Sequence, residues 1–226
     1  YSVSFDGVDA AGNVVSIVTS NSVTYDITAP VFSIVSPITS AIVNTANVSY
    51  TLSEPLATGT VTFTHTGGVT DVSSPHVVNL AGAELNVGPF NGTLTNAPTL
   101  VDGAIYSVFF DGSDTGGNIA TTVTSTSVNY DVTVPMFSSV SPVTSTTVND
   151  ANVAYTLSEP LASGTVTFTL TGGSVDDFSP HIVNLANNEL NAGVFIGALS
   201  NAPTLLDNAI YSVSFDGVDA AGNVAS

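Results

Sequence analysis

Hydrophobic and polar residues alternate along several short runs of this chain, in the pattern of half-buried β-strands. Val48, Tyr50 and Leu52 alternate with Ser49 and Thr51. Val, Thr, Ile, Tyr and Phe fill such runs, and Gly, Pro, Asn, Asp and Ser separate them, as in strands joined by turns. No stretch of helical length is amphipathic, and only residues 79–86 leave room for a short helical turn. The pattern predicts an all-β protein.

The sequence repeats itself with a period of 105 residues. Residues 1–105 and 106–210 share 70 identities in 105 positions, and residues 1–16 match 211–226 at 15 of 16. This period is too long for a solenoid unit of about 20–50 residues, and it is the size of an independently folding domain. The repeat therefore predicts a tandem array of domains.

Each repeat holds seven predicted strands. Counted from Pro30, they are expected near residues 31–36, 47–53, 59–65, 75–80, 88–94, 104–110 and 119–130. Seven short strands in about 100 residues are typical of an immunoglobulin-like Greek-key β-sandwich, and Asp102 and Tyr106 resemble the tyrosine corner of such folds. The Cys–Trp–Cys core of antibody domains is absent, because the chain has no Cys and no Trp.

Two Asp-x-Thr-x-Pro segments, Asp26–Pro30 and Asp131–Pro135, are predicted to be short linkers stiffened by proline. Residues 1–29 are then the last two strands of one domain, 30–134 a complete domain, and 135–226 a domain without its last strand. We expect these domains to form an extended rod excerpted from a longer array. The alternative is a self-assembling filament, in which residues 14–26 of one copy complete the open edge of another by strand addition.

The charge of the chain excludes several classes of partner. It has 18 acidic residues, three His and no Lys or Arg, for a net charge of −18. Such a chain cannot neutralise the phosphates of a nucleic acid or bind an anionic membrane surface. Without Cys it has no disulfide or thiolate chemistry, and no run approaches the roughly 18 apolar residues of a membrane-spanning helix.

Three acidic features recur from repeat to repeat: an Asp-Gly-x-Asp-x-x-Gly-Asn loop, a Ser-Glu-Pro segment and the first Asp of each linker. In a Greek-key sandwich the loop between the second and third strands, the loop between the sixth and seventh strands and the preceding linker all lie at the same end. We therefore expect one cluster of acids at each inter-domain junction. The candidate residues are Asp26, Glu54, Asp111, Asp114 and Asn118 at one junction, Asp131, Glu159, Asp216, Asp219 and Asn223 at the next, and Asp6, Asp9 and Asn13 in the first loop.

Clustered carboxylates repel one another unless they are protonated or bind a cation, and this chain has no basic side chain except His to offer. Carboxylate, amide and carbonyl oxygens suit Ca²⁺, which takes 6–8 oxygen ligands, better than Mg²⁺, which keeps more water. The sequence thus predicts structural calcium at the junctions. The alternative is that these acids are ordinary turn-forming residues.

The succession of Tyr-Ser-Val-x-Phe-Asp-Gly-x-Asp-x-x-Gly-Asn, Tyr-Asp-x-Thr-x-Pro and Tyr-Thr-Leu-Ser-Glu-Pro covers essentially the whole chain. It resembles the bacterial immunoglobulin-like repeats of large secreted adhesins. The resemblance implies an extracellular or cell-surface location and a role as an extender rod with calcium at its junctions. It also implies neighbouring repeats as partners, and a host or surface ligand for the whole adhesin. The absence of Lys and Arg is unusual even for that family.

A second function class is a binding module. Hydroxyl side chains recur at every second position of the third strand of each repeat. The pattern favours a solvated strand face of high β-propensity, and ice or glycan binding by ordered hydroxyls is the alternative. These residues are Thr58, Thr60, Thr62, Thr64 and Thr66, and Ser163, Thr165, Thr167, Thr169 and Thr171.

Catalysis is not expected from this sequence. Ser74 and His76 are two positions apart, but the sequence shows no acid to orient the histidine and no oxyanion hole. His76 and His181 lack the second His or Cys of a transition-metal site, and His65 is expected to pack at a strand end. Glu84 and Glu189 have no matching carboxylate of the kind that a glycosidase pairs in a cleft.

Overall fold

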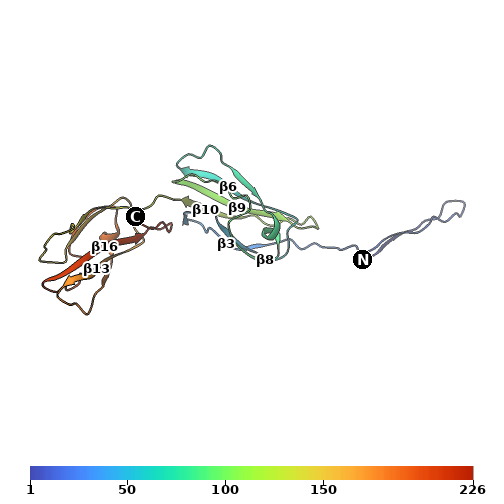
Figure 1. The fold of residues 1–226 in the computed structure, drawn as a ribbon. Helices are drawn as coiled ribbons and strands as arrows, with labels where there is room; N and C mark the ends of the chain where they lie inside the picture. The colour runs from blue at the N-terminus through green and yellow to red at the C-terminus, as the bar shows by residue number, and fades with distance from the viewer. Residues whose placement is uncertain (226) are drawn as a thin grey trace.

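The computed structural model of the chain describes residues 1–225 as an N-terminal hairpin and two β-sandwiches, which Figure 1 shows one after another along an extended line. The hairpin has strands β1 (Val3–Phe5) and β2 (Val18–Ser20). The first sandwich has β3 (Phe32–Ser36), β4 (Ile42–Val43), β5 (Val48–Leu52), β6 (Thr58–Gly68), β7 (His76–Asn79), β8 (Gly88–Gly92), β9 (Ala104–Ser113) and β10 (Val123–Tyr130).

The second sandwich repeats this order with β11 (Phe137–Ser141), β12 (Val153–Leu157), β13 (Ser163–Gly173), β14 (His181–Asn184), β15 (Gly193–Gly197) and β16 (Ala209–Val218). A single 3₁₀ turn follows the fourth long strand of each sandwich, η1 (Gly82–Leu85) and η2 (Asn187–Leu190). The first of them lies where the sequence leaves room for a short helical turn. No helix among the described residues is long and apolar enough to cross a membrane.

The first sandwich packs a sheet of order β3-β5-β8 against one of order β4-β10-β9-β6-β7. Consecutive strands leave one sheet and return to it later, as in a Greek key, so the predicted all-β immunoglobulin-like sandwich is confirmed. All seven predicted strands are present. Strand β4, which pairs in parallel with β10, was not predicted, because a two-residue strand carries no alternation.

The core of the first sandwich follows the alternation read from the sequence. On β9, Tyr106, Val108 and Phe110 are completely buried, because β10 and β6 flank this strand within its sheet and the other sheet covers its inner face. Tyr50 of β5 packs edge-on against Phe110, at a ring-centroid distance of 6.0 Å. Such aromatic pairs add about 0.5–1.5 kcal/mol beyond the area that they bury.

The second sandwich has its own buried cluster, whose members lie between Val153 and Leu199. Within residues 135–225 no strand pairs with the outer side of β16. Tyr211, Val213 and Phe215 are therefore only partly buried, whereas their counterparts on β9 are fully buried. The domain limits drawn from the linkers, 1–29, 30–134 and 135–226, stay predictions.

Candidate metal centres at the linkers

A tight loop follows the sixth long strand of the first sandwich and carries Asp114 and Asn118. The Asp114 carboxylate accepts hydrogen bonds from the Asn118 backbone N–H and from the Asn118 side-chain amide, both at 2.8 Å. Gly117 has φ = +86°, a conformation that glycine adopts without the Cβ penalty of other residues. Hydrogen bonds from Asn118, first of all that from its side chain, lower the pKa of Asp114. The loop thus holds a buried carboxylate in its ionised form.

The loop fixes the linker beside it. The Asn118 side-chain amide also donates to the backbone carbonyl of Asp26, at 3.2 Å, and the Asp26 carboxylate in turn accepts the Thr28 N–H, at 3.0 Å. One oxygen of each of three carboxylates, Asp26, Glu54 and Asp114, then lies within 4.8 Å of the others. The three acids come from three separate segments, the linker, the β5–β6 loop and the β9–β10 loop.

Glu54 is the member of this cluster that nothing in the described chain satisfies. Its Oε1 is buried and has no hydrogen-bond partner. Burial, followed by the charges of Asp26 and Asp114, raises the pKa of Glu54. A buried carboxylate oxygen without a donor is costly, so this atom needs either a proton or a cation.

The same arrangement recurs at the second linker. Carboxylate oxygens of Asp131, Glu159 and Asp219 lie within 4.8 Å of one another, and the Asn223 amide donates to Asp219, at 2.8 Å, and to the Asp131 carbonyl, at 3.0 Å. Oε1 of Glu159 is again buried without a partner. Burial and the charge of Asp131 are the leading causes of the raised pKa of Glu159. The same geometry is thus present at both linkers.

The second junction contains two further residues that the sequence did not point to as parts of it. Asp102 adds its charge to the causes that raise the pKa of Glu159, and its carboxylate holds the linker by accepting the Val132 N–H, at 2.8 Å. Asn44 of the first sandwich donates to Asn223 Oδ1 in the second, at 3.1 Å. Asp102 was predicted for the tyrosine corner; its contact with a linker 30 residues away leaves no local signal.

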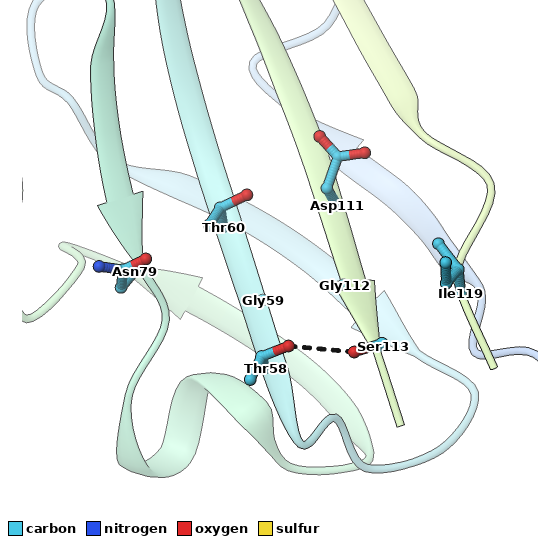
Figure 2. Close-up of a pocket in the computed structure, with 8 residues that line it drawn as sticks. All are labelled: Thr58, Gly59, Thr60, Asn79, Asp111, Gly112, Ser113 and Ile119. Carbon is cyan, nitrogen blue, oxygen red and sulfur yellow. Dashed lines mark hydrogen bonds between the residues drawn. The ribbon is translucent and has the colours of Figure 1, made fainter. Parts of the chain in front are cut away.

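The structure does not bring Asp111 and Asp216 to these clusters, which corrects that expectation. Strand β9 runs on to Ser113, and alternation places Asp111 on the outer face of the sheet, opposite Thr60. There its carboxylate accepts a hydrogen bond from Thr122. In the same way, Asp216 of β16 lies opposite Thr165 of β13. Both acids border a shallow, open depression, which Figure 2 shows for Asp111.

The first loop of the chain carries Asp6, Asp9 and Asn13. It has the same internal hydrogen bonds as the other two loops, but it is not part of a carboxylate cluster. The Asp9 carboxylate accepts the backbone N–H and the side-chain amide of Asn13, at 2.9 and 2.7 Å. Among the described residues, no linker acid and no glutamate lie beside this loop. The loop is therefore a self-contained turn, and it becomes part of an acidic cluster only where a linker and a Ser-Glu-Pro segment meet it.

The hydroxyl ladder on β6 forms a single row. Thr62 lies between Val77 of β7 and Phe109 of β9, whereas Thr60 lies between polar residues of the same two strands, so the neighbours of the row are mixed. Thr58 bonds to Ser113 across the strands, at 3.0 Å (Figure 2). A single row with mixed polar and apolar neighbours is not the flat two-dimensional array of hydroxyls that an ice surface would match.

His76 has the acidic partner that sequence reasoning did not find. The Asp71 carboxylate lies 2.6 Å from His76 Nε2 and accepts the Tyr106 hydroxyl proton at 2.7 Å. Tyr106 also accepts the Val101 N–H, at 3.0 Å, which makes it the tyrosine corner. The Ser74 hydroxyl is occupied elsewhere, because it accepts the His65 N–H at 2.7 Å. Asp71, His76 and Tyr106 therefore tie loops together, and His181, Asp176 and Tyr211 repeat them.

The hydrogen bonds of Asp71 with His76 and Tyr106 predict that the free energy of unfolding falls at acidic pH. Hydrogen bonds from His76, and then from Tyr106, lower the pKa of Asp71 from 3.8 to about 2. A lowered carboxyl pKa contributes stability that is complete above the unfolded pKa and is lost as pH falls through the folded one. In chelator, we expect wild-type stability to fall faster than that of Asp71→Asn between about pH 4 and pH 2. Thermal unfolding monitored by circular dichroism measures this difference. Parallel curves for the two proteins would contradict it, and Asp207→Asn is the exposed control.

No protein-family model matches the chain, and no curated protein matches it. Among solved structures, it is similar to the FN1–FN3 domains of chicken CNTN1, a crystal structure of three successive domains. The similarity has a TM-score of 0.46 and 12% sequence identity, and it covers 100% of this chain and 72% of that one. The likeness concerns the fold alone.

Proposed function

We propose that this chain is a structural extender segment of a cell-surface or secreted protein, in which calcium stiffens the junctions between successive sandwiches. The single observation that carries the proposal is the buried, unpartnered Oε1 of Glu54, repeated by Glu159. The carboxylate of each of these glutamates lies in a cluster with two further carboxylates. A cation satisfies all three at once, whereas a proton satisfies only one.

The oxygens available at each junction fit calcium better than smaller ions. Three carboxylates supply up to six oxygens, and water supplies the rest of the 6–8 that Ca²⁺ takes. Asn118 acts as a positioning residue, since its amide nitrogen already clamps Asp114 to the linker carbonyl. Mg²⁺ requires near-ideal octahedral geometry and retains several waters, so it suits a cluster of three protein carboxylates less well.

The placement of the ligands explains how binding would stiffen a rod. Asp131 belongs to the linker, whereas Glu159 and Asp219 belong to the second sandwich, and Asn44 of the first sandwich already reaches Asn223. An ion shared by linker and sandwich removes the freedom of the linker to swing. The net charge of −18 adds repulsion between copies, which favours separate extended chains. We accordingly propose that the rod lies outside the cell.

Calorimetric titration tests this function. We expect two equivalents of Ca²⁺ to bind per chain, one equivalent to bind to Glu54→Gln, and both to bind to Asp111→Asn. Asp111 is the matched control, because it lies in the same domain but outside the cluster. Glutamine keeps the size of Glu54 and removes its charge, so the fold is retained. Absence of calcium binding to the wild-type chain, or an unchanged stoichiometry in Glu54→Gln, would refute the proposal.

A further inference from the structure

The two repeats differ at one exposed sheet edge. Strands β8 and β15 occupy equivalent places, each at the end of a three-stranded sheet. The sequence of β8 is Gly-Pro-Phe-Asn-Gly, and that of β15 is Gly-Val-Phe-Ile-Gly. The central Phe packs inward in both, since Phe90 and Phe195 stack on Tyr50 and Tyr155. The difference is therefore confined to the side chains that point outward.

Val194 and Ile196 turn their backbone groups toward the open edge. The Ser158 N–H donates to the Met136 carbonyl, so Ser158 directs its backbone groups toward the side of β11. Thr156, two residues earlier along β12, directs its backbone N–H and C=O toward the same side. Hydrogen-bonding directions alternate along an antiparallel ladder. Val194, which lies opposite Thr156, therefore points its N–H and C=O away from the sheet, and so does Ile196. Their side chains are 71% and 77% exposed.

The first repeat blocks the same edge. Pro89 stands where β15 has Val194, and proline has no N–H to offer a pairing strand. Asn91 stands where β15 has Ile196, so the apolar outward face is lost as well. Proline and polar residues on an edge are a common protection against edge-to-edge association. Strand β15 lacks that protection.

We propose that β15 pairs antiparallel with β15 of a second copy of this chain, which joins two rods side by side. The two-fold axis passes through the pair of facing Phe195 residues. The backbone N–H and C=O of Val194 in one copy then bond to those of Ile196 in the other, and Ile196 of the first copy bonds to Val194 of the second in the same way. The two outward side chains then form two apolar cross-strand contacts. The strand is thus complementary to itself, as a two-fold interface requires.

The edge around β15 carries little charge that would oppose a second copy. Between Glu189, which is 2% exposed, and Asp207 the sequence carries no ionisable side chain. The rest of a chain with net charge −18 repels its copies, so pairing is confined to an uncharged edge. Salt screens that repulsion. The pairing of like-charged copies therefore strengthens with ionic strength, whereas binding to a cationic partner would weaken.

Sedimentation equilibrium of the intact chain tests the proposal. At millimolar protein in high salt, we expect the average mass to rise toward twice 22.8 kDa, and to stay at the monomer value for the double variant Val194→Pro, Ile196→Asn. The first repeat carries the same two residues at the same places, so the variant is compatible with the fold, which circular dichroism verifies.

The reciprocal variant separates this edge from every other exposed surface. Pro89→Val with Asn91→Ile opens the edge of β8 as well, and we expect species larger than dimers from it. A monomeric wild-type chain in high salt would overturn the proposal, and so would a double variant at positions 194 and 196 that still dimerises. A dimer that dissociates as salt rises would also overturn it, because it would indicate a contact between unlike charges.

Discussion

Replacing Glu54 by glutamine is expected to stabilise the chain in chelator and to destabilise it in calcium. Without the ion, Oε1 of Glu54 is buried without a donor, and the carboxylate lies close to those of Asp26 and Asp114, so removal of its charge relieves repulsion. With the ion, the same substitution deletes a ligand. For wild type, binding contributes about 2.7 kcal/mol per site at 100-fold excess over the dissociation constant. For a domain of this size, that is a rise in melting temperature of roughly 10 °C or more.

Differential scanning calorimetry of the wild type, Glu54→Gln and Asp111→Asn, each with calcium and with chelator, measures the reversal. Asp111→Asn should respond to calcium as the wild type does. The pH dependence adds an independent check: because the pKa of Glu54 is raised in the fold, its contribution in chelator becomes less favourable as pH rises through that pKa. A Glu54→Gln variant that shifts the melting temperature in the same direction under both conditions would contradict a metal role.

Much of this architecture could be predicted, because it depends on local patterns. Alternation located the long strands, and the repeat supplied each observation twice. The convergence of linker, β5–β6 loop and β9–β10 loop followed from Greek-key topology alone. This topology predicts that Asp26, Glu54 and Asp114 lie together, and in the structure one carboxylate oxygen of each lies within 4.8 Å of the others.

The prediction for Asp111 was wrong because it depends on the exact residue at which a strand ends. Asp111 and Asp114 stand three residues apart in one motif, and both were assigned to the loop. Because β9 continues to Ser113, Asp111 belongs to the strand. Side chains alternate between the two faces of a sheet, and this alternation places Asp111 on the outer face. Strand ends are the least certain part of a prediction from pattern, and here the end of one strand separates a candidate ligand from a surface residue.

Other side chains act through partners that are distant in the sequence, so no pattern could reveal them. Asp71 meets Tyr106 from 35 residues away, and Asn44 meets Asn223 from 179 residues away. Glu84 is a similar case. The sequence suggests no role for it beyond a catalytic acid without a partner, whereas in the structure it is 3% exposed and its carboxylate accepts hydrogen bonds from its own turn and from the loop after β8.

Replacing Glu84 by alanine is expected to cost about 3 kcal/mol, since the part-buried N–H groups of Ala81 and Thr95 lose their acceptor at about 1–3 kcal/mol each. One carboxylate oxygen accepts the Ala81 N–H at 2.7 Å, and the other accepts the Thr95 N–H and, at 2.8 Å, the Thr95 hydroxyl. The Tyr50 hydroxyl donates to the Glu84 carbonyl at 2.7 Å, which ties the 3₁₀ turn to the core. A loss of this size is a large part of the roughly 5–15 kcal/mol that stabilises a domain.

Urea unfolding with fluorescence and circular dichroism as probes measures the loss, and three comparisons show its origin. Glu84→Gln retains one acceptor oxygen and should lose less than Glu84→Ala. Glu189→Ala, which removes the same contacts to Ala186 and Ser200 in the second repeat, should destabilise that sandwich instead of the first. Asp207→Ala, at an exposed carboxylate, should change the stability by less than about 0.5 kcal/mol. Because none of these residues touches the linker clusters, calcium binding by the folded Glu84→Ala chain should be unchanged. A weakened calcium affinity in that variant would mean that the 3₁₀ turn and the junction are energetically coupled.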